Sequence, residues 1–214
     1  MRLIGVFGGT FDPIHHGHLR MAQEVLDATP MQQLRLIPCH IPPHREEPGA
    51  SSSARVKLME VALAHADPRL EIDTRELDRP GPSYMVDTLI SLRETVGPDV
   101  SLALILGVDA AQGLPEWSRW TQLTSLAHLI ILSRPGYSPE WPQALEDHLR
   151  ARWCQHPDQL LNQPQGFAIQ LPVTQLEISA SKIRRLLRQG LSAAYLTPEP
   201  VLAEIERRGL YRPD

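Results

Sequence analysis

Two histidines three residues apart, following a pair of glycines, form the part of this chain best suited to chemistry on a phosphate. The apolar residues 3–7 before the glycines are typical of a buried strand, and residues 19–28 have the spacing of an amphipathic helix. Backbone N–H groups in a glycine turn and at a helix N-terminus bind anions. His15 and His18 lie one helical turn apart, so both side chains project to one side of that helix end.

The chemistry that this arrangement suits is transfer of a phosphate-linked group. Negative charge develops on nonbridging and leaving oxygens in such reactions, and fixed hydrogen-bond donors stabilise it. Imidazole N–H groups at a helix N-terminus are such donors, which makes His15 and His18 the candidate catalytic side chains. Gly8, Gly9 and Thr10 are the candidates to bring backbone amides to the phosphates. No nucleophilic side chain is required, because one substrate's phosphate can attack the other substrate directly.

Two other interpretations of the histidines stay open at this point. One is a helix start whose histidines are simply exposed to solvent. The other is a metal site formed by five histidines, namely His15, His16, His18, His40 and His44. No acidic residue or cysteine lies at helical spacing beside them, and Pro13 and Gly17 favour a tight turn, which argues against a metal site.

A second motif lies near the other end of the chain, Ile178-Ser179-Ala180-Ser181-Lys182-Ile183-Arg184. Ser181 is predicted to cap a helix that Gly190 ends. Arg184 follows Ser181 by three residues and shares its helix face. By itself, this segment also fits a capped basic helix on the surface.

The first stretch resembles the signature of the nucleotidyltransferase superfamily, whose short core is His-x-Gly-His. Its longer form, Gly-Gly-Thr-Phe-Asp-Pro-Ile-His-His-Gly-His, resembles bacterial nicotinate mononucleotide adenylyltransferases. That family adds a second motif, Ile-Ser-Ser-Thr-x-Ile-Arg, from which this chain departs at Ala180 and Ser181. The resemblance extends over nearly the whole chain. It implies a reaction of ATP with nicotinate mononucleotide that gives nicotinate adenine dinucleotide and pyrophosphate, a step of NAD biosynthesis. Mg²⁺ is expected as cofactor, held mainly by the substrate phosphates.

The resemblance also implies roles for residues on the ATP side. Arg184 becomes a third catalytic candidate, and Ser181 and Arg184 are expected to contact the ATP phosphates together with His18. The amides of Gly8, Gly9 and Thr10 complete this predicted ATP site.

For the mononucleotide, the resemblance implies a phosphate-contacting loop with His44 and Arg45, where the family has lysine at the second place. Tyr84 and Thr88 are candidates for the pyridine pocket, within a segment where Met85 replaces a family threonine. The remaining candidates follow predicted strand ends: Asp109 for ribose hydroxyls, Trp117 to stack on the pyridine ring, and Arg134 as a phosphate partner. Exposed-loop or core roles remain the alternatives for these residues, and Trp120 is expected to be structural.

The elements that must position these residues alternate between strand and helix patterns. Strands are predicted at 2–7, 34–38, 70–73, 100–106, 129–133 and 167–171. Helices are predicted at 17–28, 54–66, 83–96, 117–126, 141–153, 181–189 and 199–208. Such alternation predicts an α/β fold, with a Rossmann-like, doubly wound and mostly parallel sheet and a small helical C-terminal part. Ligands bind beyond the carboxyl ends of such strands, where the candidate residues lie.

Composition narrows the classes further. The 214 residues fit a single domain over 1–214, and the net charge of −4 gives no basic field for nucleic acid. No apolar run approaches the roughly 20 residues of a membrane span, and no leader pattern is seen, so a cytoplasmic protein without membrane contact is expected. Cys39 and Cys154 match no metal or redox spacing and are expected to be free thiols, although a disulfide stays open.

The absence of other motifs disfavours other enzyme classes. The chain has no P-loop, no Gly-x-Gly-x-x-Gly after its first strand and no Gly-x-Ser-x-Gly elbow. Three alternatives remain: a transferase of this scaffold that acts on nicotinamide mononucleotide or phosphopantetheine, a non-catalytic nucleotide sensor, and a metal-binding protein that uses the histidines.

Overall fold

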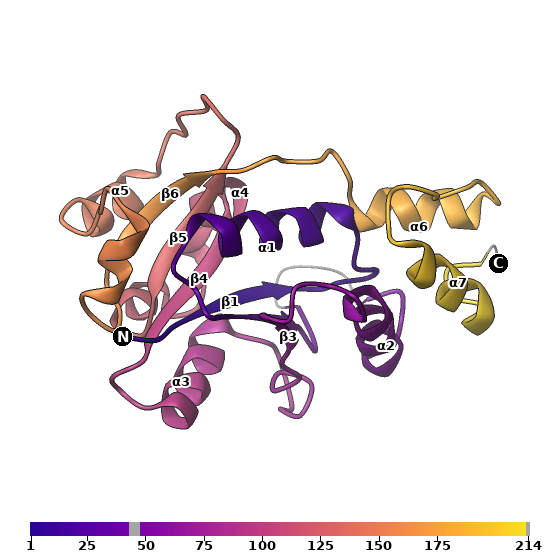
Figure 1. Ribbon diagram of the computed structural model, residues 1–214, viewed down its shortest axis with the longest axis horizontal. Helices are drawn as coiled ribbons and strands as arrows, with labels where there is room; N and C mark the ends of the chain where they lie inside the picture. Colours follow the sequence, from indigo (N-terminus) through magenta and orange to yellow (C-terminus); the bar gives the residue numbers. More distant parts are fainter. Residues whose placement is uncertain (43–47, 213–214) are drawn as a thin grey trace.

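The computed structural model describes residues 1–42 and 48–212, and its centre is a six-stranded sheet (Figure 1). The strand order is β3-β2-β1-β4-β5-β6, and the five pairings between neighbours are all parallel. This confirms the predicted doubly wound, Rossmann-like sheet. The strands are β1 (Leu3–Gly9), β2 (Gln33–Pro38), β3 (Leu70–Ile72), β4 (Ser101–Gly107), β5 (His128–Ser133) and β6 (Ala168–Pro172).

Helices cover both faces of this sheet, as its strand sequences require. Along β4, Leu102, Leu104 and Leu106 belong to one core cluster, whereas Ala103 and Ile105 belong to the other. The cluster with Ala103 also holds residues of α1 (His16–Ala28) and α2 (Ser52–Leu63). The cluster with Leu102 holds residues of α3 (Met85–Val96), α4 (Val108–Gln112) and α5 (Gln143–Leu149). Figure 1 shows α1 and α3 on opposite sides of β1.

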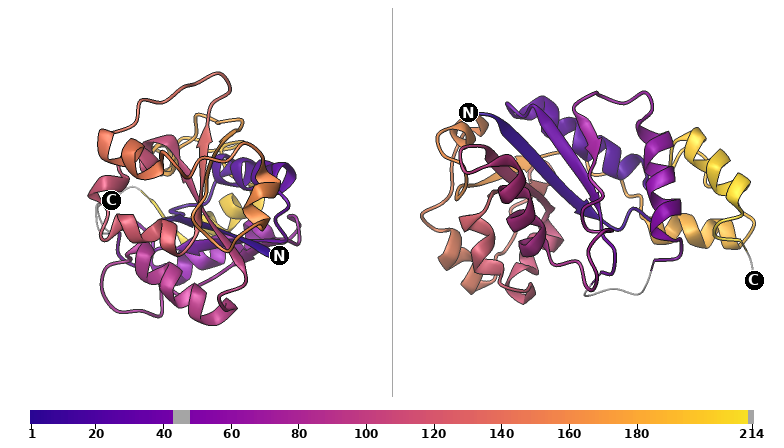
Figure 2. Two further views of the ribbon diagram at one scale, coloured as in Figure 1. Left: turned by 90° about the vertical axis from the view of Figure 1, so that its left-hand side faces the viewer. Right: turned by 90° about the horizontal axis from the view of Figure 1, so that it is seen from below.

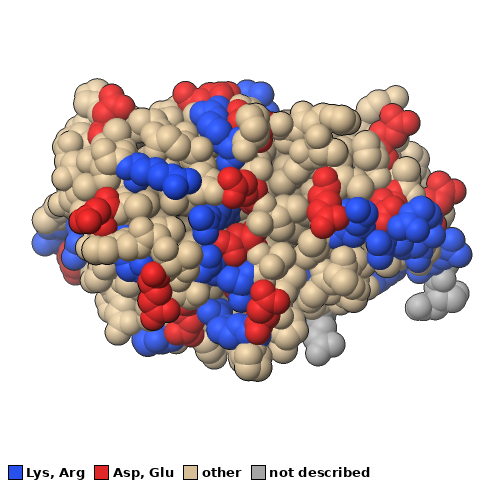
Figure 3. Space-filling view, turned by 60° about the horizontal axis from the view of Figure 1, so that its bottom comes forward, with Lys and Arg blue, Asp and Glu red and all other residues tan. Residues whose placement is uncertain are grey.

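The C-terminal part is a pair of helices, α6 (Ala180–Arg188) and α7 (Glu199–Arg208), at one end of the molecule (Figure 2). Val201 and Ile205 of α7 join the core cluster of α1 and α2, so this part is packed onto the sheet domain. The predicted small helical C-terminal part is thereby confirmed. Figure 3 shows basic and acidic side chains mixed over one face, with basic side chains gathered over this end.

The predicted helix 117–126 is wrong in type. The segment contains one 3-10 helix, η2 (Trp120–Ser125), whose N-cap Arg119 has a φ of 50°, and another, η1 (Leu114–Glu116), comes before it. A left-handed residue ends a helix, and no glycine or proline signals it at this place. Three elements were not predicted, namely η1, α4 and η3 (Pro157–Leu161), because three to five residues are too few to show a helical period.

The predicted cap of α6 is also wrong by two residues. Ser179 is the N-cap, and its hydroxyl accepts a hydrogen bond from the Lys182 N–H at 3.2 Å. Ser181 lies inside the first turn and is exposed. Its hydroxyl is therefore not used for capping. Gly190, with φ of 68°, follows the helix as predicted.

The structure also bears on the cysteines and on membrane-spanning segments. Cys154 is a buried free thiol, as predicted, and the Cys39 sulfur lies 3.7 Å from the Thr10 hydroxyl. No helix in the described part of the chain is long and apolar enough to span a membrane.

Candidate active site

The loop between β1 and α1 lies where the sheet reverses its winding. β1 neighbours β2 on one side and β4 on the other, so the connections after β1 and β4 diverge at their carboxyl ends and leave a crevice there. The loop of residues 10–15 follows β1, and Val108 and Asp109 follow β4 at the same edge. The first motif is thus placed at the ligand-binding edge of the fold.

His15 and His18 form a stacked pair at the start of α1. Their ring centroids are 3.7 Å apart with an interplanar angle of 23°. The backbone N–H of His15, the N-cap, donates a hydrogen bond to Nδ1 of His18 at 3.3 Å. Because Nδ1 of His18 is an acceptor, the ring proton of His18 lies on Nε2. His18 thus presents an N–H donor on the side of the ring opposite the backbone.

His15 is a buried, neutral imidazole. Its side chain is only 5% exposed, and burial, followed by the charge of His16, lowers its pKa to about 4. Its Nδ1 is buried without a hydrogen-bond partner within the described residues. A protein rarely retains such an atom for stability alone, and unpaired polar atoms gather at functional sites.

Gly17 allows these rings to sit against the second motif. A Cβ at Gly17 would lie 3.0 Å from Cε1 and Nδ1 of His15 and 3.6 Å from the carbonyl oxygen of Ile178. The glycine of the His-x-Gly-His core therefore serves close packing rather than backbone conformation. It lies at the contact between the two motifs.

Arg184 joins the two motifs directly. Its Nη1 donates to the backbone carbonyl of Asp12 at 2.7 Å and lies 3.4 Å from the Asp12 carboxylate. The structure therefore brings Arg184 to the loop of His15 and His18, as the motif pair predicts. Ser181 is the second residue of the same helix and is exposed.

Arg55 is a residue of this site that the sequence analysis missed. It is fully buried in α2, and its guanidinium donates to the carbonyls of Thr10 and Cys39, both at 2.7 Å. These carbonyls follow β1 and β2, so Arg55 holds the two strand ends together. The signal in the sequence was a charged residue within a buried helix face, next to Ala54 and before Leu58.

The segment of Tyr84 is fixed from behind by a buried network. Thr88 is fully buried, and its hydroxyl donates to Glu76 at 2.6 Å and accepts from Arg79 at 3.2 Å. Burial raises the pKa of the Glu76 carboxyl. Tyr84, the N-cap of α3, is half-buried. The predicted pair is thus split: Tyr84 has exposed surface, whereas Thr88 is enclosed and acts on its surroundings through Glu76 and Arg79.

Trp117 lies next to this segment. It is half-buried against the core cluster of α3, and an Arg119–Asp87 ion pair at 2.6 Å ties its segment to that helix. Trp120 packs against the same cluster and contacts His148 edge-on, with centroids 4.9 Å apart. Both tryptophans are therefore half-buried, so burial alone does not distinguish a ring-stacking residue from a core residue.

Asp109 and Arg134 come together at the ends of β4 and β5. With Val108, Tyr137 and Gln175 they line a cavity of about 250 Å³. Arg134 donates from Nε to Oε1 of Gln175 at 3.1 Å, so the segment before the second motif closes this cavity. Both candidates are exposed. His44 and Arg45, the other predicted phosphate contacts, lie outside the described residues.

The described histidines, cysteines and acidic residues include no group of three or more arranged to hold a metal ion. The imidazoles of His15 and His18 are stacked face to face, and His40 instead bonds through Nδ1 to the Arg79 carbonyl. The donors near the motifs are imidazoles, hydroxyls, guanidinium groups and backbone amides, which suit phosphate oxygens.

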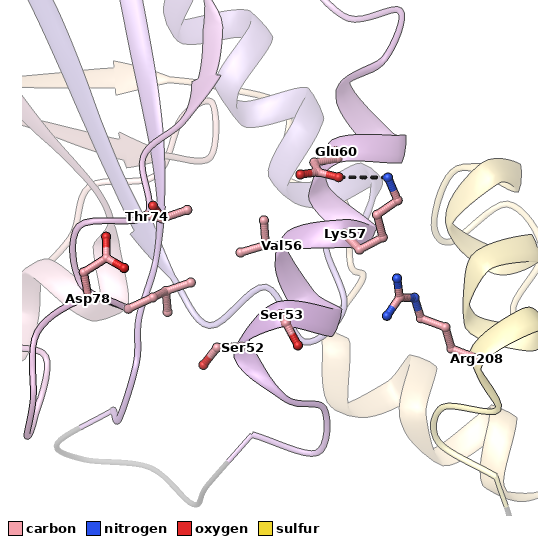
Figure 4. A pocket seen from close by; sticks show the side chains of 9 residues that line it. Ser52, Ser53, Val56, Lys57, Glu60, Thr74, Asp78 and Arg208 are labelled. Carbon is pink, nitrogen blue, oxygen red and sulfur yellow. Dashed lines mark hydrogen bonds and ion pairs between the residues drawn. The ribbon is translucent and has the colours of Figure 1, made fainter.

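A larger open groove of about 470 Å³ lies beside α2 (Figure 4). Its lining mixes hydroxyls, an ion pair of Lys57 with Glu60, and apolar side chains, and includes Arg208 of α7. No residue of either motif lines it. The site is therefore assigned from the motifs and the sheet edge rather than from cavity size.

Comparison with known proteins agrees with this geometry. The profile of the Cytidylyltransferase-like family matches residues 6–186. A curated relative from Methylococcus capsulatus, "Probable nicotinate-nucleotide adenylyltransferase", is 51% identical over 98% of this chain and 99% of its own length. A relative of the same name from Halorhodospira halophila is 47% identical over 99% of this chain and 96% of its own. The chain belongs to the nicotinate-nucleotide adenylyltransferase family.

Solved structures of similar fold carry related names. A Plasmodium falciparum nicotinic acid mononucleotide adenylyltransferase complexed with NaAD superposes with a TM-score of 0.74 at 15% identity, over 99% of this chain and 98% of that chain. The same enzyme complexed with APC gives a TM-score of 0.73 at 14% identity, with the same coverage. These likenesses show that the family's α/β fold is present over the full chain.

Proposed function

We propose that this protein joins ATP and nicotinate mononucleotide to give nicotinate adenine dinucleotide and pyrophosphate, a step in NAD biosynthesis. Membership of the adenylyltransferase family supports the reaction. The observation that carries it is the hydrogen bond from Arg184 to the Asp12 carbonyl, which brings the basic group of the second motif to the loop that leads to the stacked histidines of the first. One edge of the sheet thus gathers the donors that a triphosphate needs.

The proposed chemistry is one direct displacement. A phosphate oxygen of the mononucleotide attacks the α-phosphorus of ATP in line, the bond to the β-phosphate oxygen breaks, and pyrophosphate leaves. No covalent enzyme intermediate is formed, because the attacking group belongs to the substrate. The protein's part is positioning and fixed hydrogen-bond donation to the charge that develops.

His15 and His18 are the proposed donors to that charge. The Nε2–H of His18 needs no reorganisation, because the His15 backbone N–H already holds the other ring nitrogen. His15 is neutral near pH 7, since its pKa is about 4, and it adds an imidazole without a full charge. The amides of Gly8, Gly9 and Thr10 approach the phosphates from the end of β1.

Arg184 and Ser181 are proposed to hold the β- and γ-phosphates. The guanidinium of Arg184 is anchored by Asp12 and retains 24% exposure of its side chain, so it has donors left for an anion. Ser181 has an exposed hydroxyl one turn earlier. Both project from the first turns of α6, whose N-terminus also favours negative charge.

The mononucleotide is proposed to bind between Tyr84 and Trp117, with the pyridine ring stacked on Trp117. The Thr88 network holds this wall in place. Asp109 is proposed to accept hydrogen bonds from ribose hydroxyls, and Arg134, across the same cavity, to contact phosphate. His44 and Arg45 are proposed to add contacts to the mononucleotide phosphate.

Mg²⁺ fits this site as a cation carried by the triphosphate. The donor set of the site lacks an acidic cage among the residues described, so its protein contacts are few and the phosphates supply most ligands. When bound, Mg²⁺ neutralises charge on the departing pyrophosphate. We further propose a cytoplasmic location, which the free thiol of Cys154 supports, and small-molecule partners rather than nucleic acid or membrane.

The proposal is tested by incubating the protein with ATP, Mg²⁺ and nicotinate mononucleotide and by measuring pyrophosphate and dinucleotide together. The two products are expected in equal amounts, and omission of Mg²⁺ should abolish both. Pyrophosphate without dinucleotide would indicate hydrolysis and contradict a transferase.

A further inference from the structure

The carboxylate of Asp12 is a meeting point of segments far apart in the chain. It is 1% exposed, and its Oδ2 accepts a hydrogen bond from the Gly49 N–H at 2.7 Å. Its Oδ1 accepts from the Ala50 N–H at 3.1 Å and from the hydroxyl of Tyr211 at 2.5 Å. Arg184 lies 3.4 Å from Oδ2. A buried carboxylate with three donors and one cation around it has little freedom to rotate.

Tyr211 reaches this carboxylate from beyond the last helix. Its side chain is 7% exposed, and its φ of 56° turns the chain back toward the sheet domain after α7. Burial, and then the hydrogen bond to Asp12, raise the pKa of the Tyr211 phenol above its usual range. The hydroxyl therefore keeps its proton and stays a donor to Asp12.

Two further contacts tie the C-terminal segment to the same loop. The Thr197 hydroxyl donates to the carbonyl of Ile14 at 2.7 Å, and the His16 N–H donates to the carbonyl of Leu196 at 3.1 Å. With Tyr211, the segment 196–211 thus contacts the first motif at three places between β1 and α1. Arg184, from α6, contacts the same loop.

We propose that Tyr211 and Asp12 are positioning residues that hold Arg184 against the loop leading to the stacked histidines, which makes the C-terminal segment part of the ATP site. The inference rests on the proposed function. Arg184 donates a hydrogen bond to the backbone carbonyl of Asp12 and forms an ion pair with the Asp12 carboxylate at 3.4 Å. The Tyr211 hydroxyl shares Oδ1 of this carboxylate with the Ala50 N–H, so its loss weakens the hold on that oxygen and alters the direction of the guanidinium that faces the ATP phosphates.

The test is Tyr211→Phe, which removes one hydroxyl and keeps the ring. The affinity for ATP and kcat/KM for ATP are both expected to fall about tenfold, whereas KM for nicotinate mononucleotide stays unchanged. Tyr195→Phe is the matched control, because Tyr195 directly precedes this segment and is 93% exposed. That variant should behave like the unaltered protein.

A double-mutant cycle distinguishes positioning from a general loss of stability. If Tyr211 acts through Arg184, Tyr211→Phe has no further effect on kcat/KM for ATP in the Arg184→Ala background. Losses that multiply, or an unchanged ATP affinity in Tyr211→Phe, would overturn the proposal. Thermal melting of each variant checks the fold, and Asp12→Asn, which keeps the side-chain volume, supplies a second variant in the same cycle.

The unaltered protein in the same assay separates this inference from the proposed function. If it releases pyrophosphate normally while Tyr211→Phe matches it, only the positioning role is wrong. If it does not turn over at all, the proposed function fails. ATP affinity, measured by titration calorimetry, then still decides whether Tyr211 sets the ATP site.

Discussion

At the scale of single residues, the imidazole of His18 both caps the start of α1 and supplies the proposed hydrogen-bond donor. Its Nδ1 accepts the N-cap N–H of α1, which fixes both the ring's orientation and the position of its proton. Phe11 contacts the same ring edge-on, with centroids 5.0 Å apart. The donor is thus held before substrate arrives, which is the condition under which a hydrogen bond stabilises a transition state most.

His18→Asn separates these two functions. The side-chain oxygen of asparagine can accept the N-cap N–H in place of Nδ1, whereas the Nε2–H is lost. We expect kcat to fall on the order of 10²-fold or more, with a melting temperature close to that of the unaltered protein. Steady-state kinetics and thermal melting measure both. An unchanged kcat would remove His18 from the catalytic account; His65→Asn, at an exposed position, is the control.

Trp117 gives a second prediction at this scale. If its ring stacks on the pyridine, Trp117→Ala raises KM for nicotinate mononucleotide about tenfold, in keeping with a loss of roughly 1–1.5 kcal/mol of aromatic contact, and leaves KM for ATP nearly unchanged. Trp120→Ala, in the neighbouring 3-10 helix, should lower the melting temperature without this selectivity. Equal increases of both KM values in Trp117→Ala would place Trp117 in the core instead.

The residues that the sequence could and could not predict differ in how far their contacts reach. His15, His18 and Arg184 belong to compact motifs whose residue types already suit phosphate chemistry. Arg55 and Tyr211 act through backbone carbonyls or a carboxylate brought to them by folding, and no local pattern marks such partners. Thr88 was predicted from its motif, but its enclosure depends on Glu76, twelve residues earlier.

At the scale of elements, the start of α1 is the most constrained place in the fold. Its N-cap is a histidine, its second residue is a glycine, and no side chain of the usual capping type is present. Glycine at position 17 lowers the stability of the helix, but it allows close contact between Gly17, His15 and Ile178. The strand before it and the helix after it are ordinary, so the predicted boundaries at this place lie close to the observed ones.

Gly17→Ala tests whether this packing serves catalysis. Alanine favours the helix by up to about 1 kcal/mol, but its Cβ would lie 3.0 Å from the His15 ring and must displace it. We expect kcat to fall about tenfold or more while the melting temperature falls little. Gly113→Ala, where a Cβ would meet its nearest atom at 3.6 Å, is the control. Full activity in Gly17→Ala would show that the ring position tolerates a shift.

At the other elements, local sequence patterns predicted some features correctly and others wrongly. The β-branched and leucine-rich runs of β4 and β5 predicted buried strands correctly, because continuous burial on two faces leaves a continuous apolar sequence. The cap of α6 was misplaced because Ser179 and Ser181 are chemically alike at the sequence level. Only the hydrogen bond to the Lys182 N–H distinguishes them.

At the scale of the whole molecule, the strand order places the site. Alternating strands and helices predicted a parallel sheet, yet the order β3-β2-β1-β4-β5-β6 follows from pairings between distant segments. That order puts β1 beside β4 and opens the crevice at their ends. The segments on either side of α7 then contact the loop after β1 and the start of α1, at Asp12, Ile14 and His16, which the sequence pattern did not reveal.

Burial of neutral histidines makes stability depend on pH. His15 and His128 each have a pKa of about 4, mainly because of burial, whereas an unfolded histidine titrates near 6.5. Between these values the unfolded chain binds protons that the native protein does not. The free energy of unfolding is therefore expected to fall as pH drops from about 6.5 toward 4, by roughly 1 kcal/mol per pH unit for each histidine, and to change little above pH 7.5.

Urea unfolding at pH 7.5, 6.5 and 5.5 measures this dependence. His128 faces Arg93 and bonds to the Gln163 carbonyl, away from the motifs, so His128→Gln isolates one titration from catalysis. In His128→Gln, the free energy of unfolding should depend on pH less steeply, by the contribution of one proton. The exposed-site variant His65→Gln should keep the full pH dependence. An unaltered slope in His128→Gln would show that other groups govern the acid sensitivity.

The central claim is that this protein transfers an adenylyl group to nicotinate mononucleotide. The most direct measurement is of pyrophosphate release from ATP in the presence of Mg²⁺. It compares nicotinate mononucleotide with nicotinamide mononucleotide as the acceptor, side by side. We expect a kcat/KM at least tenfold higher for nicotinate mononucleotide, a difference of about 1.4 kcal/mol or more. Turnover of neither acceptor, with ATP bound, would contradict the assigned substrate and leave only the nucleotide-binding fold.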